Sequence, residues 1–89
     1  MTDIETAPAA FTMYSTTTCG PCIRLKQRLN ELGVSFAEVN IEDDAAAAEW
    51  VMSVNEGDRL VPTLLFADGS WLINPPVEEV LARMAALGD

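Results

Sequence analysis

The chain has only two cysteines, Cys19 and Cys22, which stand two residues apart in the stretch "TTTCGPCIRLK". Such a pair can serve as a redox centre, as part of a metal site or as a structural disulfide. A structural disulfide is disfavoured, because a bridge across two intervening residues closes a very short loop and constrains the unfolded chain little. A metal site is also disfavoured, because a closed zinc or iron–sulfur centre usually takes four ligands and the chain has no histidine and no third cysteine. The spacing therefore predicts thiol–disulfide exchange, with a metal-cluster or thiol-binding module as a distant alternative.

The two thiols are predicted to have different roles. Cys19 precedes the first predicted helix, where free backbone N–H groups favour the thiolate and lower the pKa of the thiol. Cys22 shares one helical face with Leu25, Leu29 and Leu32 and should therefore be more buried. We expect Cys19 to be the nucleophile and Cys22 the resolving thiol. The lack of histidine excludes a hydrolase with a Cys-His pair.

The residues around the cysteines fit this chemistry. Pro21 suits the first turn of a helix, where a missing N–H costs little, and Gly20 keeps the approach to the thiols open. Three of the five basic residues follow the pair, at Arg24, Lys26 and Arg28. Lys26 is two turns beyond Cys19 on the same side and is predicted to border a substrate site. Arg28 is interpreted as part of a solvated helix face, and the role of Arg24 is left open.

The composition places the chain among small water-soluble proteins. We expect residues 1–89 to form one domain, with residues 1–8 as a disordered tail. The formal net charge of −9 disfavours binding to nucleic acids or anionic membranes. No apolar run approaches the ~18 residues of a membrane span, and the first ten residues lack the basic start and apolar run of a signal peptide. We therefore expect a cytoplasmic monomer.

Hydrophobic periodicity predicts an α/β fold with the element order βαβαββα. Strands are expected at residues 9–16, 34–41, 63–67 and 70–73, and helices at 19–33, 42–55 and 74–87. This order combines a parallel pair joined by a crossover helix with a final antiparallel hairpin. With the cysteine pair between the first strand and the first helix, it predicts a thioredoxin fold of the glutaredoxin-like kind: a four-stranded mixed sheet flanked by three helices.

Several positions carry finer expectations about helix ends, turns and buried faces. Gly33 is expected to end the first helix, Asp68-Gly69 to form a two-residue hairpin turn, and Asn74 to cap the last helix. The buried faces of the second and third helices are expected at Trp50, Val51 and Val54 and at Val77, Val80, Leu81 and Met84.

A second informative feature is the sequence Val61-Pro62-Thr63. A proline at the start of an apolar strand is tolerated when its missing N–H faces an edge. The functional interpretation is a cis peptide bond that faces the cysteines. Such a bond would leave the backbone of Val61 free to pair with an extended thiol or peptide.

Over nearly its whole length the sequence resembles the mycoredoxins, glutaredoxin-like proteins of the thioredoxin superfamily that use mycothiol where glutaredoxins use glutathione. The stretches that carry the resemblance are "YSTTTCGPCIRLK", "VNIEDDAAAAEWVMSVNEGDRLVPTLLFADGS" and "NPPVEEV". The resemblance implies reduction of mixed disulfides between proteins and mycothiol, which acts as a co-substrate and not as a bound cofactor. It implies a nucleophilic Cys19, a resolving Cys22, a backbone platform at Val61, Pro62 and Thr63, and a turn near the small thiol at Asp68, Gly69 and Ser70.

The centre of the motif departs from the usual mycoredoxin pattern. Gly20-Pro21 is the thioredoxin pair, where glutaredoxins and mycoredoxins usually have an aromatic residue at position 21. Thr18 stands where thioredoxins and many mycoredoxins have tryptophan. Because of these departures, a second hypothesis stays open: the protein is a dithiol redoxin. Such a redoxin reduces protein disulfides or donates electrons to ribonucleotide reductase, and thioredoxin reductase recharges it.

Overall fold

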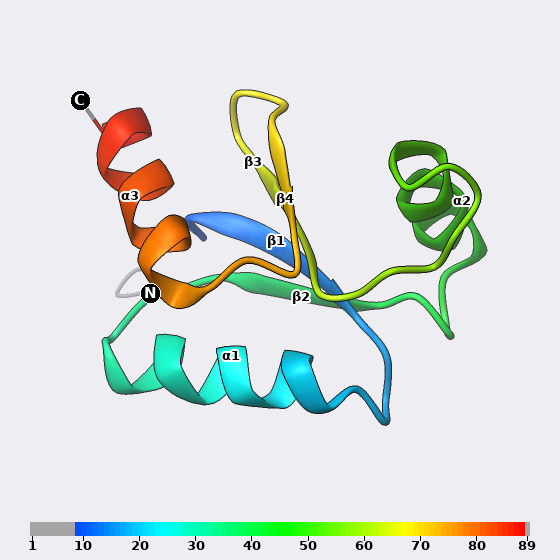
Figure 1. The fold of residues 1–89 in the computed structure, drawn as a ribbon, viewed down its shortest axis with the longest axis horizontal. Coiled ribbons are helices and arrows are strands. Elements are labelled where there is room, and N and C mark those ends of the chain that lie inside the picture. The colour runs from blue at the N-terminus through cyan, green and yellow to red at the C-terminus, as the bar shows by residue number, and fades with distance from the viewer. Residues whose placement is uncertain (1–8, 89) are drawn as a thin grey trace, which may run out of the picture.

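A four-stranded sheet forms the centre of the computed structural model, which describes residues 9–88 (Figure 1). Its strand order is β2-β1-β3-β4, and the strands are β1 (Phe11–Ser15), β2 (Ala37–Asn40), β3 (Thr63–Phe66) and β4 (Trp71–Ile73). β1 pairs in parallel with β2 and antiparallel with β3, and β3 pairs antiparallel with β4. The predicted tail at residues 1–8 lies outside the described residues.

Helices cover both faces of this sheet, and they are α1 (Gly20–Glu31), α2 (Ala45–Val54) and α3 (Val77–Gly88). The larger core cluster joins the sheet to α1 and α3, which contact each other. A smaller cluster joins the other face to α2, which Figure 1 shows well apart from α1 and α3. The element order and the mixed sheet confirm the predicted thioredoxin fold.

The central position of β1 explains its sequence. Phe11, Met13 and Ser15 are buried on the face toward α1 and α3, while Thr12 and Tyr14 are half-buried on the other side. Both faces of β1 are therefore covered, as the mostly apolar sequence predicts. The strand ends at the loop that carries Cys19, so its packing sets the position of the cysteine pair.

Several local expectations need correction. Leu32 is 46% exposed because α1 ends at Glu31, so the buried stripe of α1 consists of Cys22, Leu25 and Leu29. Leu81 is also exposed, whereas the expected inner positions Val77 and Val80 are buried. In α2 the buried residues are Ala47, Ala48 and Val51, and the larger Trp50 and Val54 are only half-buried.

The structure confirms some of the predicted helix ends and turns and contradicts others. Gly33 follows the C-cap residue Leu32 and has a φ of +74°, which confirms its role as the glycine that ends the helix. The hairpin turn has three residues and not two, because Phe66 pairs with Ser70 and Gly69 takes the positive φ. Asn74 does not cap α3, since the first helical hydrogen bonds are accepted by the Pro76 carbonyl. None of the helices within residues 9–88 is long and apolar enough to cross a membrane.

Candidate active site

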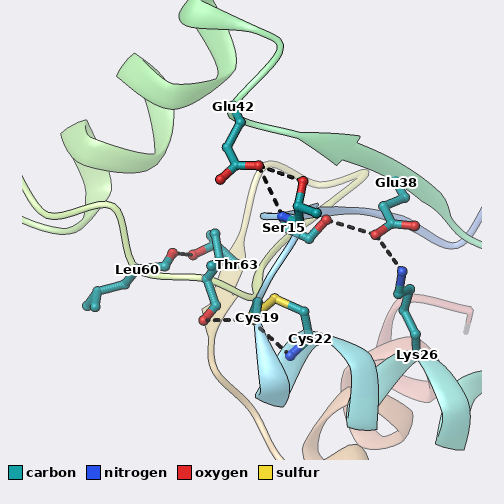
Figure 2. Close-up of a disulfide and its surroundings, with 10 residues drawn as sticks. Ser15, Cys19, Cys22, Lys26, Glu38, Glu42, Leu60 and Thr63 are labelled. Carbon is teal, nitrogen blue, oxygen red and sulfur yellow. Dashed lines mark hydrogen bonds and ion pairs between the residues drawn. A yellow bond between two sulfur atoms is a disulfide. The ribbon is translucent and has the colours of Figure 1, made fainter.

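The two cysteines lie at the N-terminus of α1 and form a disulfide (Figure 2). Cys19 is the N-cap residue, and its Sγ accepts a hydrogen bond of 3.0 Å from the backbone N–H of Cys22. This N–H and the positive end of the helix dipole are the groups expected to favour a thiolate on Cys19, and its role as the nucleophile stays a prediction. Cys22 is 1% exposed, as expected for the more buried thiol, but Cys19 is only 7% exposed, so the disulfide form does not present the exposed sulfur expected of a nucleophile. Within residues 9–88 no group of three or more Cys, His, Asp or Glu side chains could hold a metal ion.

The predicted platform lies directly beside the disulfide. The peptide bond between Val61 and Pro62 is cis, and the Val61 carbonyl oxygen lies 3.8 Å from Cys19 Sγ. Thr63 opens β3 and donates its hydroxyl to the Leu60 carbonyl at 2.7 Å, which fixes the preceding loop. Leu60 itself is half-exposed next to this loop. The fold therefore brings Val61, Pro62 and Thr63 together with Cys19, across more than forty residues of sequence.

A carboxylate that the sequence analysis missed holds the loop before Cys19. Glu42 Oε1 accepts hydrogen bonds from the Thr17 backbone N–H at 3.2 Å and from the Thr17 hydroxyl at 2.7 Å. The Asn40 amide adds a third bond to the Thr17 hydroxyl at 3.0 Å. The hydrogen bonds from Thr17 lower the pKa of Glu42. The sequence position of Glu42 could have predicted this contact. Glu42 follows β2, which is parallel to β1, and the carboxyl ends of parallel neighbours meet at one edge of the sheet.

Lys26 forms an ion pair with a residue of β2. Its Nζ lies 2.9 Å from Glu38 Oε2, which also accepts a 2.8 Å hydrogen bond from the buried Ser15 hydroxyl (Figure 2). Desolvation opposes ionisation of Glu38, but the hydrogen bonds from Lys26 and Ser15 and the Lys26 charge outweigh it and lower the pKa of the carboxyl. This ion pair ties α1 to β2 near the cysteines. The contact of Lys26 with a substrate stays a prediction.

The Glu38 network predicts a pH-dependent contribution to stability. Because the folded-state pKa of Glu38 is lowered from its ordinary value of 4.5, its contribution is present above pH 4.5 and is lost as the pH falls through the folded-state pKa. Glu38→Gln is expected to reduce the free energy of unfolding by at most about 1 kcal/mol near pH 7. Urea unfolding of both proteins should show this gap closing as the pH falls toward about 3.

The matched control is Glu31→Gln, which removes the solvent-exposed partner of Arg28. This substitution is expected to change stability less than Glu38→Gln, because exposed pairs contribute little. A gap between wild type and Glu38→Gln that stays constant from neutral to acidic pH would contradict the assigned ion pair.

The expectation for Asp68, Gly69 and Ser70 is wrong. These residues form the β3–β4 turn, where Asp68 Oδ1 accepts from the Ser70 N–H and hydroxyl. β3 runs away from Pro62, so its far end pairs with the beginning of β1 and the turn lies at the opposite end of the sheet from the cysteines. Figure 1 shows the β3–β4 turn at the top and the loop between β1 and α1 at the lower right.

The segment that does return to the cysteines follows β4. The Asn74 N–H donates a 2.7 Å hydrogen bond to the Pro62 carbonyl, so Asn74 lies against the platform. The register of the hairpin could have predicted this, because a strand antiparallel to β3 must end where β3 begins. The residue type of Asn74 alone predicts only a helix cap.

Comparisons with known proteins agree with this site. The glutaredoxin family model matches residues 11–71. A Mycobacterium tuberculosis protein that carries a glutaredoxin name is 51% identical over 79 residues, which span 89% of this chain and 94% of that protein. Mycoredoxin 1 of Corynebacterium glutamicum is 40% identical over 76 residues, which span 85% of this chain and 94% of that protein.

Solved structures support the fold. The glutaredoxin of Methanosarcina mazei Go1 has a TM-score of 0.69 at 23% identity and covers 85% of this chain and 78% of its own. A thioredoxin-like protein has a TM-score of 0.68 at 24% identity and covers 81% of this chain and 96% of its own. The matched residues of the family model include Cys19, Cys22 and the loop at 61–63, which supports thiol–disulfide redox activity. The chain belongs to the glutaredoxin family and resembles its mycoredoxin members.

Proposed function

We propose that the protein reduces mixed disulfides between mycothiol and protein cysteines, with Cys19 as the nucleophile. The observation that carries the proposal is the placement of Cys19 Sγ. It accepts a hydrogen bond from the Cys22 N–H at the N-terminus of α1 and lies 3.8 Å from the Val61 carbonyl oxygen. The first feature favours a reactive thiolate, and the second offers backbone groups to an extended substrate. The choice of mycothiol rests on the likeness to Mycoredoxin 1.

The reaction follows from ordinary thiol–disulfide exchange. The Cys19 thiolate attacks the mycothiol sulfur of the mixed disulfide, and the client thiolate leaves and takes up a proton. Cys19 then carries mycothiol in a new disulfide bond. A second mycothiol thiolate attacks the mycothiol sulfur on Cys19, which releases mycothiol disulfide and regenerates the Cys19 thiolate. Each turnover therefore exchanges the mixed disulfide for mycothiol disulfide and consumes one free mycothiol, and Cys22 is not required.

A coupled assay with three electron donors tests the choice of thiol. A mycothiol–peptide mixed disulfide is offered with mycothiol and its reductase, and a glutathione–peptide disulfide with glutathione and its reductase. A protein disulfide with thioredoxin reductase forms the third arm. We expect the highest turnover in the first arm, and faster turnover in either of the other arms would contradict the proposal.

The Cys19–Cys22 disulfide favours the dithiol route as a second candidate function. Cys22 is buried directly behind Cys19 and can attack the Cys19 sulfur, which releases the small thiol or client and forms this disulfide. An external dithiol must then reduce the pair before another cycle. Thioredoxin reductase or another protein reductase is the expected donor on this route.

A further inference from the structure

A pocket of about 230 Å³ lies next to the redox motif, between α1 and the segment that leads into α3. Pro21, Arg24 and Arg28 contribute to its α1 wall, and residues 74–77 form the opposite wall. The opposite wall is rich in proline, with Pro75 and Pro76 at its centre. The pocket therefore combines an arginine-bearing side with an apolar side.

Each wall of the pocket contacts a residue close to the redox centre, Gly20 on one side and Pro62 on the other. The Arg24 guanidinium folds back over the motif, since a Cβ placed on Gly20 would lie 3.3 Å from Arg24 Nη1. The other wall is held by the Asn74 N–H, which bonds the Pro62 carbonyl at 2.7 Å. The pocket therefore adjoins the redox motif and the platform, although neither cysteine lines it.

The pocket is a basic site in an acidic protein. The chain has a net charge of −9 and five basic residues, two of which line this pocket, while no lining residue is acidic. Arg24 makes no ion pair or side-chain hydrogen bond with any residue in the range 9–88. Arg28 pairs with Glu31 only at the exposed surface. A guanidinium whose planar donors are free matches the geometry of a carboxylate.

We propose that this pocket binds the side-chain carboxylate of a glutamate or aspartate that flanks the disulfide cysteine of a protein client. The proposal rests on the proposed function, because it concerns the protein half of the mixed disulfide. At about 230 Å³ the pocket is smaller than the roughly 300–1,000 Å³ of sites that enclose a whole small molecule, and it fits one side chain. The carboxylate meets the Arg24 guanidinium while its methylene groups lie against Pro75 and Pro76. This contact offsets the repulsion between an acidic client and the rest of the surface.

The test compares mycothiol–peptide mixed disulfides that differ only by glutamate or glutamine at each of the two positions on either side of the cysteine. In at least one position, wild-type protein is expected to reduce the glutamate peptide with a kcat/KM about three- to tenfold higher than the glutamine peptide. Arg24→Gln is expected to bring this ratio to about 1, and Arg24→Lys to leave part of it, because lysine keeps the charge but loses the planar donors.

Arg83→Gln is the matched control, because it removes one positive charge beside Ser70 at the far end of the sheet. It is expected to keep the wild-type ratio. Equal rates for both peptides at every position in the wild type, a preference that persists in Arg24→Gln, or an equal loss in Arg83→Gln would each overturn the proposed pocket. Wild-type protein that reduces neither peptide contradicts the proposed function itself, and activity without preference contradicts the pocket alone.

Discussion

Replacement of Cys19 by serine is expected to lower kcat/KM for a mycothiol–peptide mixed disulfide by at least about 1,000-fold. The serine hydroxyl keeps the size and the position at the N-terminus of α1 but is not ionised at neutral pH, so the attacking sulfur anion is lost. The measurement is the release of the peptide thiol under steady-state conditions, with mycothiol and its reductase in excess. A variant that keeps a tenth or more of the wild-type value would show that Cys19 is not the nucleophile.

Cys22→Ser is the matched control for this experiment. Because the proposed route regenerates Cys19 with a second mycothiol, this variant is expected to keep about half or more of the wild-type rate on the same substrate. Its reduction of protein disulfides, which needs the second thiol, is expected to be lost. If Cys22→Ser abolishes both activities, the dithiol route accounts for the protein better than the proposed one.

Leu29→Ala is expected to lower the free energy of unfolding by about 2–5 kcal/mol. The Leu29 side chain is fully buried where α1 packs on the sheet, so its loss leaves a cavity in the larger core cluster. Urea unfolding followed by circular dichroism measures the change. Because α1 carries both cysteines, the variant should also lose activity at a lower temperature than the wild type.

Leu32→Ala is the matched control, because Leu32 is the last leucine of the helical face that the sequence predicts to be buried. Leu32 is 46% exposed at the end of α1, so its replacement is expected to cost less than about 1 kcal/mol. Similar losses for the two variants would contradict the end of α1 at Glu31 and support the longer buried face, with Leu32 included, that the sequence predicts.

Much of the fold could be predicted from local patterns. The structure confirms the alternation in β1, the buried positions Leu25 and Leu29 of α1, and Gly33 beyond its end, which all depend on short-range physics. The incorrect predictions concern the ends of helices and the side chains whose burial depends on an element far away in the sequence. Leu32 continues the spacing of Leu25 and Leu29, yet α1 ends at Glu31 and the Leu32 side chain is 46% exposed.

The site was predictable to the extent that its residues are adjacent in sequence. The cysteine pair and the loop with Pro62 are short motifs, and the cis bond beside Cys19 agrees with their expected juxtaposition. The turn with Asp68 was misplaced because its position depends on the direction of β3 and not on its own composition. The roles of Glu42 and Asn74 depend on which strand ends meet, and a residue-type pattern does not contain that information.

The most direct measurement of the central claim is the intact mass of Cys22→Ser protein after one turnover with a mycothiol–peptide mixed disulfide and no free mycothiol. Without the second thiol, the first covalent product on Cys19 cannot be resolved and accumulates. The account predicts a mass increase equal to one mycothiol on Cys19 and an equal amount of free peptide thiol. A mass increase equal to the peptide, with release of mycothiol, or no adduct on Cys19, would contradict it.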